Sequence, residues 1–453
     1  MSFCLLDFLW KHGNLKQKWE ICTENYRIYL RGVMDKFVIE GKARLSGTVR
    51  VGAAKNAVLP ILAASLLAER GETVINQVPD LTDINTMIEV LKYLGAEVKR
   101  DHKQKKVGIK ADSLKSSEAP YDLVRRMRAS FLVLGPILAR TGKAKVSLPG
   151  GCVIGQRPVN LHLLGLEKLG AKLKEEHGYI VASCDNLKGA CVCFDRPSHT
   201  GTENLIMAAA LGTGRTTLIN AACDPEVVDL ANFLNLMGAK VEGAGTSIVT
   251  VKGVKRLRAV EYTPIPDRLE AGTFMMAAGI TGGYLEIKNA DLAHLTIAIQ
   301  KFQEMGLDIQ ENKGSVKVKG PRRLKGISVT TYPHPGFPTD LQASVMALAA
   351  VADGGSEIRE TVFEERFTHV MELNRLGANI KVEGDKATIS GVPRIKGATI
   401  MASDIRAGAG LTLAGLVAEG VTEIMRVYHI DRGYENFETK LATLGAKIKR
   451  VKE

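Results

Sequence analysis

The stretch Leu94-Gly-Ala-Glu-Val-Lys99 is one of six near copies of a motif in this chain of 453 residues. Successive glycines of the motif are 75, 68, 68, 71 and 68 residues apart, which is the regularity of a structural repeat. Each copy follows an amphipathic helical pattern, such as 83–93 or 226–236, and precedes an alternating strand pattern. The glycine is therefore predicted to end each helix in a left-handed conformation. The other copies are Leu169-Gly-Ala-Lys-Leu-Lys174, Met237-Gly-Ala-Lys-Val-Glu242, Met305-Gly-Leu-Asp-Ile-Gln310, Leu376-Gly-Ala-Asn-Ile-Lys381 and Leu444-Gly-Ala-Lys-Ile-Lys449.

Each repeat begins with a second kind of helical pattern, which is rich in Ala, Gly, Leu and Met and almost free of charge beyond its first turn. A helix that is apolar on all sides is buried on all sides, so these helices are expected in the interior. Each is followed by a strand, then the amphipathic helix and two more strands. Six units in two groups of three predict an α/β protein of two similar domains, with helices inside and sheets outside. The interior helices are predicted at 53–67, 128–139, 203–211, 271–280, 340–351 and 406–417.

Composition and charge limit the classes of partner. The formal net charge of +12 favours anionic partners. Lys and Arg are spread along the chain without interleaved aromatic residues, whereas proteins that read nucleic acids usually cluster their charge or add stacking rings. A small anionic ligand is therefore expected, and no nucleic acid. No apolar run reaches the roughly 18 residues of a membrane helix, so no membrane insertion is expected.

The seven cysteines are an odd number scattered along the chain, which argues against a disulfide framework and for the reducing cytosol. A cytoplasmic protein is therefore expected. Cys191 and Cys193 would share one face of a strand, but without a second ligand cluster no metal site is predicted. Residues 1–33 hold both tryptophans, lack the repeat and show no secretion-signal pattern. They are interpreted as an accessory extension or an upstream start, outside the fold that opens at Met34.

Charged residues at the starts of the interior helices indicate where a ligand binds. If the helices of a domain run parallel, their N-terminal ends gather on one face, where free N–H groups suit a phosphate. Capping explains the acidic residues equally well. It does not explain the cations, because a positive charge is unfavourable at a helix N-terminus unless an anion is present. The charged or polar residues concerned are Lys55, Asn56, Arg128, Glu203, Asn204, Asp267, Arg268, Glu270, Asp340, Asp404 and Arg406.

Two connecting loops would lie on the same face. The loop 148–158 reads Leu-Pro-Gly-Gly-Cys-Val-Ile-Gly-Gln-Arg-Pro and carries Cys152 and Arg157. The guanidinium of Arg157 would lower the pKa of a nearby thiol. Taken alone, such a loop is more often a glycine turn with a buried cysteine. The loop 426–434 adds Arg432 and His429, and the histidine is interpreted as a structural residue. Cations, acids and a thiol around one cleft would suit a substrate with both phosphate and carboxylate groups.

From Met34 to the C-terminus the chain closely resembles the UDP-N-acetylglucosamine 1-carboxyvinyltransferases, or enolpyruvyl transferases. The resemblance implies the inside-out α/β barrel, with two domains of three repeats each. It also implies chain crossovers near Lys55 and Asp267, so that domain one comprises 34–54 and 266–453 and domain two comprises 55–265. The motifs that carry it are Gly52-Ala-Ala-Lys-Asn-Ala57, Met127-Arg-Ala-Ser130, Leu148-Pro-Gly-Gly-Cys-Val-Ile-Gly-Gln-Arg-Pro158, Pro335-Gly-Phe-Pro-Thr-Asp-Leu-Gln-Ala343 and Tyr428-His-Ile-Asp-Arg-Gly-Tyr434.

The implied reaction transfers the enolpyruvyl group of phosphoenolpyruvate to the 3′-hydroxyl of UDP-N-acetylglucosamine and releases phosphate, as the first committed step of peptidoglycan synthesis. Cys152 matches the family's general acid, and Asp340 matches the residue proposed as base beside the sugar hydroxyl. No metal or cofactor is required, because several cations clamp the phosphate. Lys55 and Arg432 are also counted among the catalytic residues. The substrate-binding positions that match are Lys55, Asn56, Arg128, Arg157, Pro158, Val159, Asn160, Leu161, Asp340, Asp404 and Arg432.

Two departures from the family pattern concern the nucleotide. Asn160 stands where many members have Asp, so a contact to the uracil would be made by an amide. The segment 198–204 also differs from a common version, which leaves its nucleotide contacts open. Two other functions stay in view: the related enzyme that acts on shikimate 3-phosphate, which lacks the Pro-Gly-Gly-Cys loop, and a non-catalytic paralogue that binds the sugar nucleotide or a protein partner.

Overall fold

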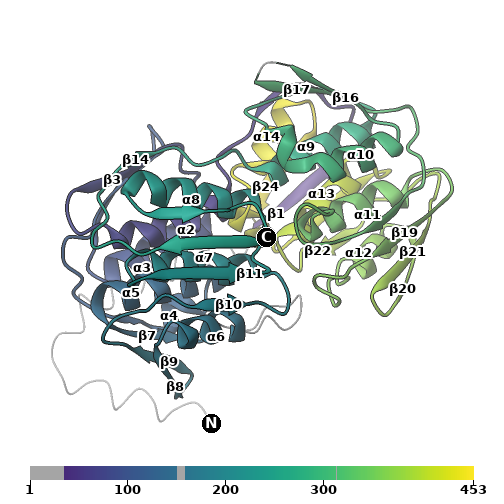
Figure 1. The fold of residues 1–453 in the computed structure, drawn as a ribbon. Coiled ribbons are helices and arrows are strands. Elements are labelled where there is room, and N and C mark those ends of the chain that lie inside the picture. The colour runs from purple at the N-terminus through teal and green to yellow at the C-terminus, as the bar shows by residue number, and fades with distance from the viewer. Residues whose placement is uncertain (1–34, 150–158, 313, 453) are drawn as a thin grey trace, which may run out of the picture.

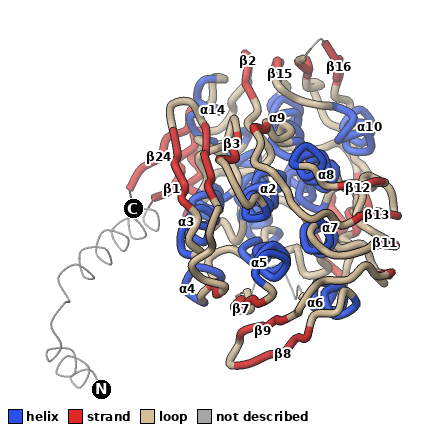
Figure 2. Tube along the Cα trace, turned by 60° about the vertical axis from the view of Figure 1, so that its left-hand side comes forward, coloured by secondary structure: helices blue, strands red, loops and turns tan. Residues whose placement is uncertain are grey.

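The computed structural model describes residues 35–149, 159–312 and 314–452. In this part of the chain the strands form six four-stranded sheets. Figure 1 shows two halves side by side, and in the turned view of Figure 2 most strands lie at the periphery around centrally placed helices. The predicted α/β fold, with helices inside and sheets outside in two sets of three repeats, is confirmed.

Six interior helices form the centres of the two halves. Nearly all their residues are buried, as their lack of charge predicted. Their bounds are α2 (Lys55–Ala64), α5 (Leu134–Thr141), α7 (His199–Ala210), α9 (Arg268–Thr281), α11 (Gln342–Ala350) and α13 (Ile405–Val417). Short helical turns accompany them: η1 (Ser65–Leu67), α4 (Tyr121–Val124), η2 (Arg128–Val133), η3 (Leu292–Leu295), η4 (Thr339–Leu341) and η5 (Val427–Arg432), where η denotes a 3₁₀ helix.

Two predicted starts of interior helices are wrong: α9 begins at Arg268, three residues before the expected position. The helix expected to begin at Glu203 begins four residues earlier, at His199, and is α7. Ser198 is its N-cap, because its hydroxyl accepts a hydrogen bond from the Gly201 N–H at 3.2 Å. Glu203 and Asn204 are therefore not at the start of the helix, and both are buried.

The outer helices end at the repeated glycine, as predicted. In all six copies of the motif the glycine has a positive φ, between 93° and 108°. Side chains avoid this backbone conformation, which explains why only glycine occupies the position. The outer helices are α3 (Thr82–Tyr93), α6 (Asn160–Lys168), α8 (Pro225–Met237), α10 (Thr296–Glu304), α12 (Val370–Arg375) and α14 (Phe437–Thr443).

The six sheets share one strand order. In each, the first strand runs parallel to the second, and the remaining neighbours are antiparallel. From edge to edge the sheets are β14 (Glu261–Tyr262), β3 (Glu72–Ile75), β5 (Lys106–Lys110), β4 (Glu97–Asp101); β6 (Glu118–Ala119), β7 (Lys143–Ser147), β9 (Tyr179–Ser183), β8 (Lys172–Glu176); β10 (Cys191–Cys193), β11 (Arg215–Ile219), β13 (Ile248–Lys252), β12 (Lys240–Glu242); β2 (Ser46–Arg50), β15 (Tyr284–Lys288), β17 (Ser315–Lys319), β16 (Asp308–Asn312); β18 (Ser328–Thr330), β19 (Gly355–Arg359), β21 (Lys386–Ser390), β20 (Asn379–Glu383); and β22 (Thr399–Met401), β23 (Val421–Met425), β1 (Asp35–Glu40), β24 (Lys447–Lys452).

The prediction of three strands per repeat missed the first strand of each sheet. In four of the six sheets that strand precedes the interior helix and its parallel neighbour follows it, so strand, helix and strand form a parallel crossover unit, whereas β2 and β14 pair across the two halves. Several of these edge strands span only two or three residues, as in β6 and β10. Such a short segment is too brief to show the alternating pattern by which strands are predicted.

The two halves exchange strands where the chain passes between them. β2 precedes α2 in the chain but pairs with β15, which follows α9, whereas β14 precedes α9 but pairs with β3, which follows α2. The two connections run antiparallel beside each other: the Ala54 N–H donates to the Ile265 carbonyl at 2.8 Å, and the Asp267 N–H donates to that of Gly52 at 2.9 Å. Each half is therefore completed by a strand from the other side of the crossover.

Two hydrophobic cores correspond to the two halves. One contains buried residues between Ala53 and Leu257, and the other contains residues from 37–51 and 269–448. The N-terminal strand β1 completes the sheet of the last repeat, where it lies beside β24 (Figure 1). We propose that these cores are the two expected domains, with their boundaries at the crossovers near Lys55 and Asp267. None of the described helices is long and apolar enough to cross a membrane.

Close packing of the interior helices predicts a strong effect at Gly410 in α13. A Cβ atom there would lie 2.6 Å from the Ala343 carbonyl oxygen of α11, so two backbones would have to separate. Gly410→Ala is expected to lower the free energy of unfolding by about 1–3 kcal/mol. Gly279→Ala in α9 is the matched control, because its Cβ would meet only the movable side chain of Leu307. Urea unfolding of both variants checks this, and equal midpoints would contradict it.

Candidate active site

The predicted site residues occupy the starts of the interior helices and two neighbouring turns. Lys55 and Asn56 open α2, Arg128 opens η2, and Asp404 is the N-cap of α13. Asp340 lies in η4 and Arg432 ends η5, while Val159 immediately precedes α6 and Asn160 and Leu161 open it. Cys152, Arg157 and Pro158 lie outside the described residues, so their assigned roles stay predictions.

Lys55 and Arg432 meet at one buried carboxylate, that of Asp83 in the first turn of α3. The Lys55 Nζ lies 2.8 Å from Asp83 Oδ2, and the Arg432 Nε lies 2.8 Å from Asp83 Oδ1. Only 3% of Asp83 is exposed. Burial alone would raise the pKa of Asp83, but the charges and hydrogen bonds of Lys55 and Arg432 outweigh it and hold that pKa below its ordinary value. The carboxylate is therefore ionised, and the cluster carries one net positive charge.

A second carboxylate, that of Asp340, lies between two arginines. The Arg366 Nη1 is 2.8 Å from Asp340 Oδ1, and the Arg406 Nη2 is 3.3 Å from Asp340 Oδ2. Asp404 caps α13 by accepting from the Arg406 and Ala407 N–H groups. The Arg366 Nη2 lies 4.0 Å from Asp404 Oδ1. The starts of α11 and α13 thus lie together, as the parallel-helix argument predicted for this half.

These contacts correct one step of the sequence argument. Cations at the helix starts indicated an arriving anion, but Lys55 and Arg406 already pair with the protein's own carboxylates, Asp83 and Asp340. The unfavourable position of each cation at a helix N-terminus is thereby compensated inside the fold. A bound anion is consequently not needed to explain the presence of these two cations.

A buried polar network supports the start of α6. The Asn204 amide donates to His162 Nδ1 at 3.0 Å, and its Oδ1 accepts from the Gly135 N–H at 2.8 Å. Because Nδ1 accepts, the ring proton belongs on Nε2, which lies 3.2 Å from the Thr200 hydroxyl. Burial, with the charge of Arg128, lowers the pKa of His162 to about 3, so the ring is neutral. This network ties α6, and with it Asn160, to α5 and α7.

Another charged cluster joins the two halves. Arg268 at the start of α9 binds Glu226 through its Nε at 3.0 Å and Asp224 through its Nη2 at 3.1 Å, and both acids are in or next to the start of α8. His199 contacts Glu203 at 3.0 Å and Asp224 at 3.8 Å. Burial opposes its charge, but these acids outweigh burial and raise the pKa of His199 to about 10. His199 is therefore protonated at neutral pH.

His429 lies in η5, three residues before Arg432. Its ring lies against that of Tyr428, with centroids 4.3 Å apart. Burial and the nearby charge of Arg432 lower the pKa of His429 to about 4. The imidazole is neutral near pH 7, and it contributes no charge to the surroundings of Arg432.

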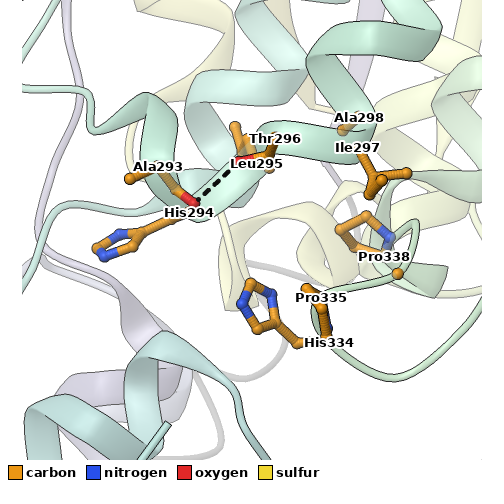
Figure 3. Close-up of a pocket in the computed structure, with 10 residues that line it drawn as sticks. Ala293, His294, Leu295, Thr296, Ile297, Ala298, His334, Pro335 and Pro338 are labelled. Carbon is orange, nitrogen blue, oxygen red and sulfur yellow. Dashed lines mark hydrogen bonds between the residues drawn. The ribbon is translucent and has the colours of Figure 1, made fainter.

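A small cavity lies near the Pro335 motif but holds no room for a sugar nucleotide. Its volume is about 40 Å³, and residues 293–298, 334–336 and 338 line it. Figure 3 shows His294 and His334 on one side of it and Pro335 and Pro338 on the other. A space of this size suits a few water molecules. Among the described residues no group of three or more His, Cys, Asp or Glu side chains is placed to hold a metal ion.

Sequence reasoning missed Asp83 and Arg366. Asp83 was part of an expected amphipathic helix, where an acid in the first turn needs no further explanation. Arg366 lies 26 residues beyond Asp340 in a segment without a repeat signature, and its side chain is only 5% exposed. No local pattern marks either residue, because their partners come from distant parts of the chain.

Comparison with known proteins identifies the family. The profile of the EPSP synthase family, 3-phosphoshikimate 1-carboxyvinyltransferase, matches residues 39–441. UDP-N-acetylglucosamine 1-carboxyvinyltransferase 2 of Carboxydothermus hydrogenoformans is 55% identical over 423 residues, which are 93% of this chain and all of the relative. The enzyme of the same name from Geobacter metallireducens is 54% identical over 420 residues, again 93% of this chain and all of the relative. The chain belongs to the UDP-N-acetylglucosamine 1-carboxyvinyltransferase family.

Solved structures agree with this family assignment at the level of the fold. The enolpyruvyl transferase NikO from Streptomyces tendae superposes with a TM-score of 0.85 at 25% identity, over 93% of this chain and 99% of that one. An EPSP synthase from Acinetobacter baumannii superposes with a TM-score of 0.73 at 18% identity, over 92% of this chain and all of that one. Enolpyruvyl transferases thus share this arrangement of sheets and helices.

Removing Arg366 is expected to destabilise the fold around Asp340. Arg366→Gln deletes a buried cation that binds Asp340 and the Thr339 hydroxyl, and should cost about 3 kcal/mol in the free energy of unfolding. Arg394→Gln is the control, since Arg394 is exposed and pairs with Glu419 at the surface, where the loss should stay below about 1 kcal/mol. Urea unfolding measures both, and a cost for Arg366→Gln no greater than that of the control would show that the pair is not stabilising.

Proposed function

We propose that the chain transfers the enolpyruvyl group of phosphoenolpyruvate to the 3′-hydroxyl of UDP-N-acetylglucosamine and releases phosphate. The observation that carries the proposal is more than 50% identity to transferases of that name over nearly the whole chain. The cluster of Lys55, Asp83 and the partly exposed Arg432 supports it, because fixed cations favour a small anion. Peptidoglycan synthesis in the cytoplasm, and through it cell shape and division, is the corresponding process.

The proposed chemistry divides between an acid and a base. Cys152 gives a proton to the CH₂ carbon of the enol double bond, and the sugar hydroxyl attacks C2 as Asp340 accepts the hydroxyl proton. The resulting tetrahedral adduct then loses phosphate and a proton, which restores the double bond. Asp340 retains 26% exposure of its side chain between Arg366 and Arg406, which supports contact with a substrate hydroxyl.

The cations bind the substrate's charges in this proposal. Lys55, Arg128, Arg157 and Arg432 take the phosphate and carboxylate of phosphoenolpyruvate, as the matching positions do in the family. Asp404 lies beside it as the N-cap of α13. The sugar nucleotide is bound by Asn56 and by the turn composed of Pro158, Val159, Asn160 and Leu161. The rigid attachment of α6 through His162 supports a fixed position for the last three of these residues.

The two alternative functions have weaker support. EPSP synthase structures share the fold at 18% identity, which says nothing of the acceptor, whereas the Pro-Gly-Gly-Cys loop matches the sugar-nucleotide enzymes. A non-catalytic paralogue would not need to keep Lys55, Cys152 and Asp340 together. We therefore place the chain among the active transferases.

Phosphate release from phosphoenolpyruvate tests the acceptor. We expect turnover with UDP-N-acetylglucosamine and release at least about 1000-fold slower with shikimate 3-phosphate, because a site built to bind one acceptor leaves its polar groups unpaired with the other. Chains that start at Met1 and at Met34 are assayed in parallel, which measures the contribution of residues 1–33. Absence of release from both chains with the sugar nucleotide would refute the proposed function.

The role of Cys152 has its own test with fosfomycin, an inhibitor that alkylates the corresponding thiol in the family. Cys152→Asp is expected to retain turnover, because a carboxylic acid can also give a proton, and to lose inhibition by fosfomycin, because the thiol is gone. Cys223→Asp, which changes a half-buried cysteine elsewhere, should remain inhibited. Unchanged fosfomycin inhibition of Cys152→Asp would remove Cys152 from its assigned role.

A further inference from the structure

Asp83 is the common partner of two cations that come from different halves of the molecule. Lys55 at the start of α2 and Asp83 in α3 belong to one half, and Arg432 at the end of η5 belongs to the other. Lys55 Nζ contacts Asp83 Oδ2 at 2.8 Å, while Arg432 contacts Oδ1 through Nε at 2.8 Å and Oδ2 through Nη2 at 3.4 Å. Both carboxylate oxygens are therefore used to bring the two cations together.

A second contact anchors the segment that carries Arg432. Glu435, three residues beyond Arg432, accepts a hydrogen bond from the Asp80 N–H at 2.9 Å and pairs with Lys105 Nζ at 2.7 Å. Asp80 precedes α3 by two residues, and Asp83 lies in the first turn of that helix. The contact of Glu435 with Asp80 and the contact of Arg432 with Asp83 therefore both lie at the N-terminal end of α3. The turn 427–435 is thus held against the other half at two points, and Arg432 has little freedom to move away from Asp83.

The charged groups that face Lys55 come from three elements. Asp83 faces it from α3 and Arg432 from η5, and the Asp267 carboxylate at the start of α9 accepts from the Lys55 N–H at 3.4 Å. His429, beside Arg432, is neutral near pH 7. Asp83 is therefore the carboxylate that pairs with both side-chain cations. Without it, Lys55 and Arg432 would be two like charges in a buried place.

We propose that Asp83 is a positioning residue for the phosphate group of phosphoenolpyruvate: it holds Lys55 and Arg432 in place, so that the anion meets a preformed pair of cations. This inference rests on the proposed function. Asp83 neutralises only one of the two positive charges. Preorganisation of this kind reduces the ordering that binding would otherwise require.

Asp83→Asn tests the inference, because the amide keeps the size of the side chain and removes its charge. Without the carboxylate, Lys55 and Arg432 lose the shared group that orients them. The KM for phosphoenolpyruvate should rise about 30-fold with kcat changed less than about 10-fold. Asp83→Glu, which restores the charge, should return the KM toward its wild-type value.

Asp431→Asn is the matched control. Asp431 is the neighbour of Arg432 in sequence, but its carboxylate pairs with Arg450 at 2.6 Å and 3.0 Å, so the substitution removes one negative charge without touching the cluster. Its KM for phosphoenolpyruvate should stay within about twofold of wild type. A purely structural role of Asp83 would lower kcat and the melting temperature but leave the KM for phosphoenolpyruvate unchanged. A wild-type KM in Asp83→Asn overturns the inference.

Failure of the proposed function is recognised separately. If wild-type protein releases no phosphate, the proposed function is wrong, and calorimetric titration with phosphoenolpyruvate then tests Asp83 directly. An affinity for phosphoenolpyruvate that is about 30-fold weaker in Asp83→Asn than in wild type supports the inference. Equal affinity of the two proteins overturns it.

Discussion

Burial of six interior helices on all sides is the constraint on which the rest of the structure depends. Such a helix cannot carry charge along its length, since a buried charge without a partner is costly. Its ends are the places where polar groups can be satisfied, and the first turn offers unpaired N–H groups for them. The chain therefore concentrates charge where the interior helices begin. Lys55, Asp340 and Arg406 lie within this zone, and the candidate site follows from the packing of the core.

Two carboxylates compensate pairs of cations in the same way. Asp83 lies between Lys55 and Arg432, and Asp340 lies between Arg366 and Arg406. In both clusters one carboxylate meets two cations, and in the second the Asp404 carboxylate also lies within 4.0 Å of Arg366. Fixed charges of this kind do not have to reorient when a phosphate or carboxylate binds, which is how an electrostatic site acts without a metal ion.

Local sequence signals predicted much of the fold. The repeated glycine was correctly placed at the helix ends because a left-handed residue is a local requirement of the backbone. The interior helices were found from composition, apart from the starts of α7 and α9, which lie four and three residues before the expected positions. The short edge strands were missed, since β6 and β10 are too brief to show a period. Cys152 and Arg157, identified by resemblance, lie outside the described residues and stay predictions.

By itself the sequence determined the six repeats, the order of helix and strand within each, and the chemical character of the residues at the helix starts. These properties depend on neighbours within a few residues. The tertiary structure alone decided that β2 and β14 change places between the halves, and that Asp83 lies between Lys55 and Arg432. The separations along the chain are 28 residues to Lys55 and 349 to Arg432. The interaction of a carboxylate with a cation depends on their distance in space. Only the packed helices bring these three side chains within hydrogen-bonding distance.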